Sequence, residues 1–136
     1  RSSLAESYLI GVITSFAGLD GFLRWNYTVF NDDPRADIRY YIFPAGDTNF
    51  VYPAKNGAPL LTLRYKALRR GIELYELLER AKETAPDAAQ AAFDMLLHTE
   101  KWGDPTALRA LPATLDYTAY ATVRRNLILA LSGKQK

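Results

Sequence analysis

The strongest constraint on the fold is a helical repeat of apolar residues in the second half of this 136-residue chain. The repeat begins soon after Pro59 and steps by three or four positions through Leu61, Tyr65, Leu68, Ile72, Tyr75 and Leu78. This spacing predicts one long amphipathic helix of about five turns. Gly71 lies inside it and weakens a helix by about 1 kcal/mol relative to alanine. We therefore expect tertiary packing at Gly71 to outweigh that local cost.

Four other segments also carry helical signals. The start of the chain predicts a helix capped by Ser2 or Ser3, with Glu6 as the acid of a capping box and Gly18 as the stop. Pro86 opens a helix over the following DAAQAAFDMLLHTE, a short helical turn is expected in TALRAL, and the last helix covers residues 117–131. The polar SGKQK tail follows that helix.

Strand signals gather between the first helix and Pro59. Residues 22–30 are dense in aromatic and β-branched side chains, DIRYYIF gives a weaker strand, and NFVYP gives a short one. The Asn56-Gly57 pair predicts a turn. In a strand over 22–30, Arg24 and Asn26 would share a mixed polar face, which suits either solvent or the lumen of a closed barrel. So few short strands leave edges that need an outside partner.

These elements predict one α/β domain over residues 1–136, with a helix and short strands in 1–58 and a helical half in 59–136. The alternative is a mainly α protein with a small sheet. The net charge of +2 gives no support for nucleic-acid binding, and no stretch approaches the ~20 apolar residues of a membrane span. The chain has no cysteine, which excludes disulfides and leaves the cellular compartment open. Because it begins with Arg1, we expect a piece of a longer protein.

Few residues suit catalysis. His98 is the one histidine and has no cysteine beside it, so we predict no metal site and no cofactor. No serine lies in a G-x-S-x-G elbow, and no phosphate-binding glycine motif is present. The neighbouring Asp32 and Asp33 could form a glycosidase acid pair, but aspartates before a proline more often shape a turn.

The aromatic residues between positions 25 and 52 are the main functional signal. They are Trp25, Tyr27, Phe30, Tyr40, Tyr41, Phe50 and Tyr52. Carbohydrate sites combine aromatic platforms with arginine, asparagine and aspartate side chains, which this region also contains. The alternative is an aromatic core beneath a small sheet.

Three ordered motifs carry a family resemblance. They are GFLRW-x-Y with a following DP, then PAGDT-x-x-VYP, then LR-x-x-ALR-x-GIE-x-YELL. From about Ala5 to about Leu78 the chain resembles the C-terminal region of the catalytic domain in bacterial glycoside hydrolases of family 123, the β-N-acetylgalactosaminidases and their relatives. The resemblance implies the C-terminal part of a (β/α)8 TIM-like barrel, a few strands followed by a helix-rich half.

The resemblance also implies a function. Such enzymes are similar to hexosaminidases that use the acetamido group of an N-acetylated sugar as nucleophile, helped by an Asp-Glu pair upstream of this region. It therefore implies no catalytic residue in this chain, which alone would be inactive. Matching positions imply Trp25 and Tyr27 as walls of the sugar site, with Asp47 and Tyr52 shaping a loop at its rim.

Four positions depart from the family pattern. An acidic residue is usual at the place of Lys66 and an aspartate at the place of Leu74, while tryptophan is common near Phe30 and glycine at Ala54. The lost acids favour an alternative function, a non-catalytic helical module that binds a glycan or a protein. Exposed strand edges suggest a third, assembly into a homo-oligomer.

Overall fold

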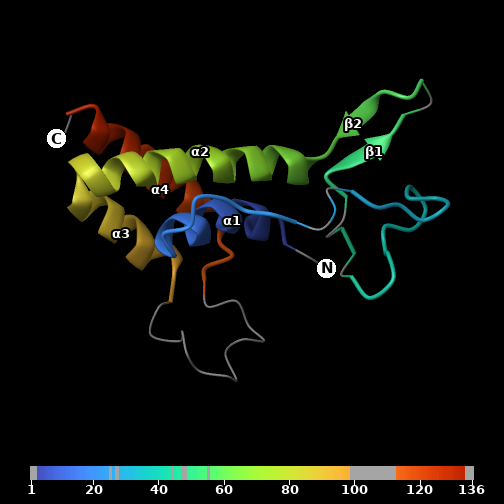
Figure 1. The fold of residues 1–136 in the computed structure, drawn as a ribbon, viewed down its shortest axis with the longest axis horizontal. Coiled ribbons are helices and arrows are strands. Elements are labelled where there is room, and N and C mark those ends of the chain that lie inside the picture. The colour runs from blue at the N-terminus through green and yellow to red at the C-terminus, as the bar shows by residue number, and fades with distance from the viewer. Residues whose placement is uncertain are drawn as a thin grey trace.

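The computed structural model describes residues 3–24, 26, 28–43, 45–46, 49–54, 56–98 and 113–133. In order, the elements of these residues are α1 (Leu4–Phe16), β1 (Val51–Pro53), β2 (Pro59–Leu61), α2 (Leu63–Thr84), α3 (Pro86–Leu96) and α4 (Tyr117–Leu131). Figure 1 shows α2 as the long central helix, with the β1–β2 hairpin beyond its N-terminal end. The fold therefore mixes helices with one small sheet.

Helix α1 begins and ends as the sequence predicts. The Ser3 hydroxyl accepts a hydrogen bond from the amide of Ala5, and the amide of Ser3 donates to Glu6 Oε1 at 2.8 Å. This capping box satisfies two amides that the first helical turn leaves without partners. At the other end Gly18 adopts a φ of +65°, a left-handed conformation that favours glycine.

Two glycines allow α1 and α2 to cross closely. A Cβ atom added to Gly11 would overlap the backbone carbonyl of Gly71. A Cβ atom on Gly71 would lie 2.7 Å from the carbonyl oxygen of Ser7 and 2.8 Å from that of Tyr8. This backbone contact is the tertiary packing expected to outweigh the helical cost of Gly71.

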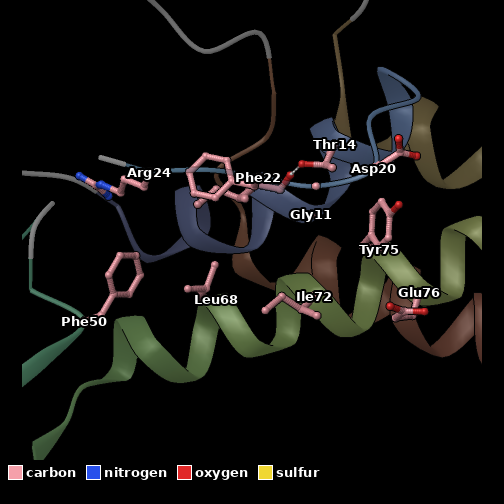
Figure 2. A pocket seen from close by; sticks show the side chains of 12 residues that line it. Gly11, Thr14, Asp20, Phe22, Arg24, Phe50, Leu68, Ile72, Tyr75 and Glu76 are labelled. Carbon is pink, nitrogen blue, oxygen red and sulfur yellow. Dashed lines mark hydrogen bonds between the residues drawn. The ribbon is translucent and has the colours of Figure 1, made fainter. Parts of the chain in front are cut away.

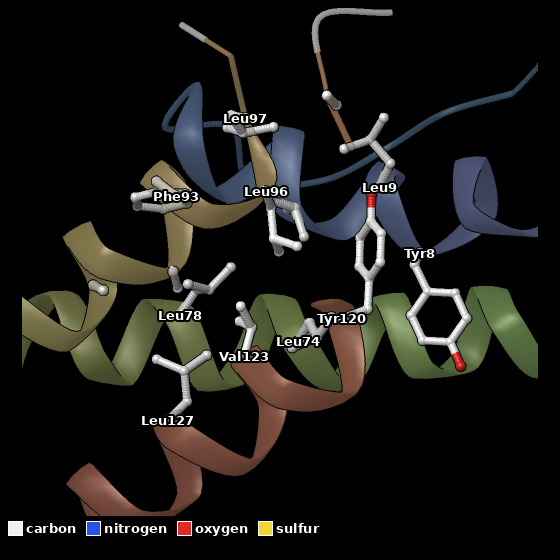
Figure 3. Close-up of a cluster of buried hydrophobic side chains, with 14 of the residues drawn as sticks. Tyr8, Leu9, Leu74, Leu78, Phe93, Leu96, Leu97, Tyr120, Val123 and Leu127 are labelled. Carbon is white, nitrogen blue, oxygen red and sulfur yellow. The ribbon is translucent and has the colours of Figure 1, made fainter. Parts of the chain in front are cut away.

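One hydrophobic core joins all four helices. Its fully buried side chains (Figure 3) include Leu9, Val12, Leu74, Leu78, Leu96, Tyr120, Val123 and Leu127. The helix predicted from Pro86 is confirmed as α3 but ends at Leu96, before His98, and the helix predicted at 117–131 is confirmed as α4. The turn predicted in TALRAL falls outside the described residues.

Helix α2 is confirmed, but it starts at Leu63, and of the predicted apolar stripe only Leu78 is buried. Thr62 caps it, its hydroxyl accepting from the amide of Tyr65. The stripe that enters the core consists of Ala67, Gly71, Leu74, Leu78 and Ala81. Small residues in this stripe made it a weaker hydropathy signal than the one that contains Leu68 and Ile72. Helix α2 therefore carries a second apolar stripe, on which Ile72 is 54% exposed.

The hairpin corrects the boundary predicted at Pro59. Residues 59–61 form β2, which pairs antiparallel with β1 in the register Val51 with Leu61 and Pro53 with Pro59. The predicted turn is confirmed, because Gly57 has a φ of +78° and Asn56 Oδ1 accepts from the amide of Ala58. Thr62 forms hydrogen bonds back to Phe50, so the hairpin leads directly into the cap of α2.

Two predicted strands are not formed in the described residues. The segment 22–30 contributes a single bridge, Thr28 with Asn49, and DIRYYIF contributes only the local bridge of Tyr40 with Phe43. Leu23 is 94% exposed, so it is not buried on an apolar strand face. The segment 22–30 has the β-branched and aromatic composition of a strand. A strand forms only when it pairs with a neighbour, and apart from the bridge of Thr28 with Asn49 this segment has no such neighbour in the described residues. Residues 18–62 are called the connecting segment below.

Candidate functional site

A groove of about 450 Å³ lies between α1, the start of the connecting segment and α2 (Figure 2). Its apolar wall is built from Ile10 on α1 and from Leu68 and Ile72 on α2. Phe22 covers it from the connecting segment. The second apolar stripe of α2 thus forms one side of a cavity whose volume is typical of small-molecule sites.

The two ends of the groove carry different polar groups. At one end the guanidinium of Arg24 lies 5.8 Å from the ring centre of Phe50, a cation–π arrangement. At the other end (Figure 2) lie the carboxyl groups of Asp20 and Glu76 and the ring of Tyr75. The Tyr75 hydroxyl donates to the carbonyl of Leu19 at 3.3 Å, which ties the connecting segment to α2.

Sequence reasoning missed the polar end of this groove. Tyr75 was predicted as part of the apolar stripe of α2, Glu76 belongs to the third family motif but was given no role, and Asp20 belongs to no motif. The signal that could have found the groove was the stripe of α2 itself, because Leu68 and Ile72 would need a cover in any fold. Which stripe faces the core is decided by the glycine crossing of α1 on α2, and sequence spacing alone does not show that crossing.

Of the four predicted sugar-contacting residues, only Tyr52 lies within the described part of the chain. It sits on β1, half-buried, and its ring stacks on that of Phe30 at a centroid distance of 6.2 Å and an interplanar angle of 17°. Trp25, Tyr27 and Asp47 fall outside the described residues. Tyr52 does not line the groove between α1 and α2.

A second, open hollow lies on the connecting segment between residues 31 and 43. Its lining contains Arg39, Tyr40 and Tyr41, and Tyr41 is 88% exposed with an unusual φ of +53°. The side-chain Nδ2 of Asn31 donates hydrogen bonds to the carbonyls of Asp37 and Arg39 and so holds this loop in shape. Exposed tyrosines beside arginine and asparagine are the residue types that contact sugars.

Asp33 acts as a turn-forming residue. Its Oδ1 accepts hydrogen bonds from the amides of Arg35 and Ala36, both at 3.2 Å. Asp32 is exposed beside it. A carboxylate committed to two backbone amides shapes a loop, so the turn interpretation of this pair is the one that the geometry supports.

The carboxyl pKa values that depart from the ordinary range in the described residues are all lowered. Hydrogen bonds from Arg39 lower the pKa of Asp37 to about 2, and the Arg70 guanidinium lowers the pKa of Glu73. Hydrogen bonding to the backbone amide of Thr118 lowers the pKa of Asp116.

The pKa of Glu79 is also lowered, since hydrogen bonds from Lys82 and Ser15 together outweigh the opposing effect of burial. A glycosidase general acid needs a raised pKa. These four carboxylates therefore do not suit that role.

Metal binding and membrane spanning find no support in the described residues. His98, half-buried, follows the end of α3, and no group of three histidine, cysteine, aspartate or glutamate side chains in the described ranges could hold a metal ion. Over the same ranges, no helix has the length and apolarity needed to cross a bilayer.

The two family departures on α2 have different surroundings. Leu74 is fully buried in the core that α2 shares with the other helices. Lys66 is exposed on the same helix. An aspartate at the first position would place a charge in an apolar core, whereas an acid at the second would meet solvent.

Comparison with known proteins gives one finding of weight. A family model described as "Glycoside hydrolase 123, catalytic domain" matches residues 1–81, which is more than half of the chain. The matched part contains α1, the connecting segment and most of α2, and so every residue of both hollows. No curated protein matches the chain.

Proposed function

This chain belongs to the glycoside hydrolase 123 catalytic-domain family, and we propose that it forms the C-terminal part of a hexosaminidase-like domain that acts on N-acetylated sugars. In this proposal the catalytic Asp-Glu pair lies upstream of Arg1, in another part of the enzyme. Within the enzyme the chain completes the barrel and contributes walls of the sugar site. In isolation it has no activity. The family match over residues 1–81 is the observation that carries the proposal.

The carboxylates support an acid pair outside this chain. Asp33 is committed to a turn, and the four shifted carboxyl groups have lowered pKa values. A general acid in a retaining mechanism must hold its proton near neutral pH, which needs burial or a neighbouring negative charge.

The uncovered face of α2 supports a role in a barrel. In a (β/α)8 barrel, helices pack their apolar faces against a ring of strands. Helices α1 and α2 lie side by side, and the groove between them is lined by Ile10, Leu68 and Ile72. Phe22, 55% exposed, lies over this groove in the segment that the sequence predicts as a strand. A neighbouring strand from the rest of the enzyme would give residues 22–30 the ladder that they lack here.

The aromatic residues of the connecting segment support a role in sugar binding. The stacked pair of Phe30 and Tyr52 and the exposed Tyr41 offer ring faces to a pyranose. We assign Trp25 and Tyr27 as wall residues and Asp47 as a rim residue on the family resemblance alone. No cofactor or metal is needed for this chemistry, because the substrate's acetamido group supplies the nucleophile.

The test is hydrolysis of an aryl N-acetyl-β-galactosaminide by the full-length enzyme and by this chain. We expect activity only from the full-length enzyme. Within it, Tyr52→Ala should lower kcat/KM by about tenfold, the effect of losing about 1.4 kcal/mol of transition-state binding. The control is Leu129→Ala on α4, a side chain that is 39% exposed and lies outside the family match, and it should leave kcat/KM within about twofold.

A full-length enzyme with an intact acid pair and no hydrolysis of any N-acetylhexosaminide would overturn the substrate assignment. Binding of such sugars without turnover would instead support the non-catalytic module, which the buried Leu74 favours because the family's aspartate is absent there.

A further inference from the structure

The junction of α1, α2 and α4 lies apart from both hollows and holds more hydrogen-bond donors than acceptors. Arg70 and Glu73 come from α2, and Arg124 comes from α4. Arg70 Nη1 donates to Glu73 Oε2 at 2.6 Å, and Arg124 Nε lies 3.4 Å from the same oxygen. Two guanidinium groups thus converge on one carboxylate, which leaves a net positive charge.

Arg124 is incompletely satisfied by this carboxylate. Its Nε is buried and makes no hydrogen bond within the described residues, although it lies 3.4 Å from Glu73 Oε2. The remainder of the two guanidinium groups faces outward, since the Arg70 and Arg124 side chains are 49% and 39% exposed. Guanidinium groups present fixed donors that match the oxygens of an oxyanion.

A tyrosine pair adds a further donor beside the arginines. The hydroxyls of Tyr8 and Tyr117 lie 2.7 Å apart, and their rings meet edge to face at 5.1 Å. One hydrogen bond uses one of the two hydroxyl protons, so the other has no acceptor among the described residues. Burial, and then the bond to Tyr117, raise the pKa of Tyr8 to about 12, so this hydroxyl keeps its proton at neutral pH. The pKa of Arg70 is raised, first by its hydrogen bond to Glu73 and last by the neighbouring Tyr8 and Tyr117.

We propose that this junction is a binding site for a small oxyanion, a sulfate, phosphate or carboxylate group, held by the outward faces of Arg70 and Arg124 and by the Tyr117 hydroxyl. Glu73 acts as a built-in counter-ion in the empty site. It holds the two arginines together, and an arriving oxyanion takes up the donors that Glu73 leaves unused. Nothing in the proposed sugar chemistry uses this cluster, and Arg124 and Tyr117 lie outside the family match.

The test is titration of the 136-residue chain with inorganic sulfate, inorganic phosphate and acetate at constant ionic strength, followed by calorimetry or amide chemical shifts. We expect saturable binding of at least one of these ions. Arg70→Gln and Arg124→Gln should each weaken it by about tenfold, because each removes a charged hydrogen-bonding partner. Their matched controls, Arg69→Gln and Arg125→Gln, carry the same charge change on the same helices and should change affinity less than twofold.

Glu73→Gln distinguishes a binding site from a structural ion pair. It removes the competing charge and keeps the side-chain shape, so the proposal expects roughly tenfold tighter oxyanion binding. A structural ion pair would lose stability on this change and gain no affinity. Binding that is not saturable, equal weakening by Arg125→Gln, or no gain in Glu73→Gln would each overturn the proposal.

A second set of titrations distinguishes an oxyanion carried by a sugar from a free ion. N-acetylgalactosamine 6-sulfate and galacturonate are compared with inorganic sulfate and acetate. Tighter binding of the sugar-borne groups would identify a charged glycan as the ligand, and equal affinities would identify a free ion. Both outcomes depend on Arg70 and Arg124, and neither depends on hydrolysis by the full-length enzyme.

Discussion

The four helices α1 to α4, called the helical bundle below, bury their apolar residues to a very different degree from the connecting segment. In the bundle, Leu74 and Leu78 are fully buried. In the connecting segment, Leu23 is 94% exposed and Ile42 is 78% exposed, although the family motifs are concentrated there and in α2. Figure 1 shows much of this segment lying beyond the bundle, around the N-terminal end of α2. The bundle therefore supplies the stability of the chain, while the connecting segment supplies the surface that the family motifs describe.

The largest expected effect tests where this stability lies. Leu74→Asp places the family's acid in a fully buried core position, and we expect it to lower the free energy of unfolding by more than about 4 kcal/mol. The matched change at the other departure, Lys66→Glu, lies on the exposed face of the same helix and should change it by less than about 0.5 kcal/mol. Urea unfolding followed by circular dichroism measures both. Similar changes in the free energy of unfolding for the two variants would contradict the placement of Leu74 in the core and Lys66 on the surface.

The second effect is a loss of stability at alkaline pH, caused by ionisation of the buried Tyr120. Tyr120 is 1% exposed, its hydroxyl donates to the carbonyl of Thr114 at 2.9 Å, and burial raises its pKa from 10.0 to about 12. Because the folded pKa lies above the unfolded one, this contribution is complete below pH 10 and is lost as pH rises toward 12. Two pKa units correspond to about 2 to 3 kcal/mol.

The measurement is the free energy of unfolding of the wild type and of Tyr120→Phe, between pH 8 and pH 12. The variant should lose about 2 to 3 kcal/mol less than the wild type over this range. It should also start about 1 kcal/mol lower at pH 8, because it lacks the hydrogen bond. Parallel curves for the two proteins would show that Tyr120 does not couple the bundle to pH.

The smallest effect compares glycines in the two regions. Gly71→Ala adds a Cβ atom within 2.8 Å of two carbonyl oxygens of α1. We expect a net loss of about 1 to 2 kcal/mol, the cost of overpacking reduced by the better helix propensity of alanine. Gly21→Ala in the connecting segment meets no atom within 4 Å and should be neutral. Thermal unfolding of both variants decides the matter, and a stabilised Gly71→Ala would contradict the close crossing of α1 and α2.

The same two regions differ in how far the sequence predicted them. The helices followed from local signals: the Ser3 cap, the stop at Gly18 and Pro86 at the start of α3 all act within one turn. The strand predicted at 22–30 depended on partners that no local pattern names, and it is not formed in the described residues. Predicting Leu68 and Ile72 as core residues failed for a related reason, because the glycine crossing turns another stripe of α2 inward.

The sequence pointed to the aromatic residues of the connecting segment as sugar-contacting residues, and this stays a prediction. It did not point to the groove between α1 and α2. The aromatic residues around Tyr52 stood out in the sequence, and the structure adds the ring stack with Phe30. The groove end with Asp20 and Glu76 and the arginine junction at Glu73 arise where helices meet. Contacts between residues as distant as Tyr8 and Tyr117 depend on the tertiary fold, and neither residue belongs to a motif.

The single core shared by four helices extends beyond the residues that the family model matches. The family match ends at residue 81, inside α2, while Leu74 and Leu78 pack against residues of α3 and α4 such as Leu96 and Leu127. A protein trimmed to the matched residues would expose that leucine surface to water and would aggregate on expression. The two C-terminal helices thus cover a leucine surface that the matched residues alone would leave exposed.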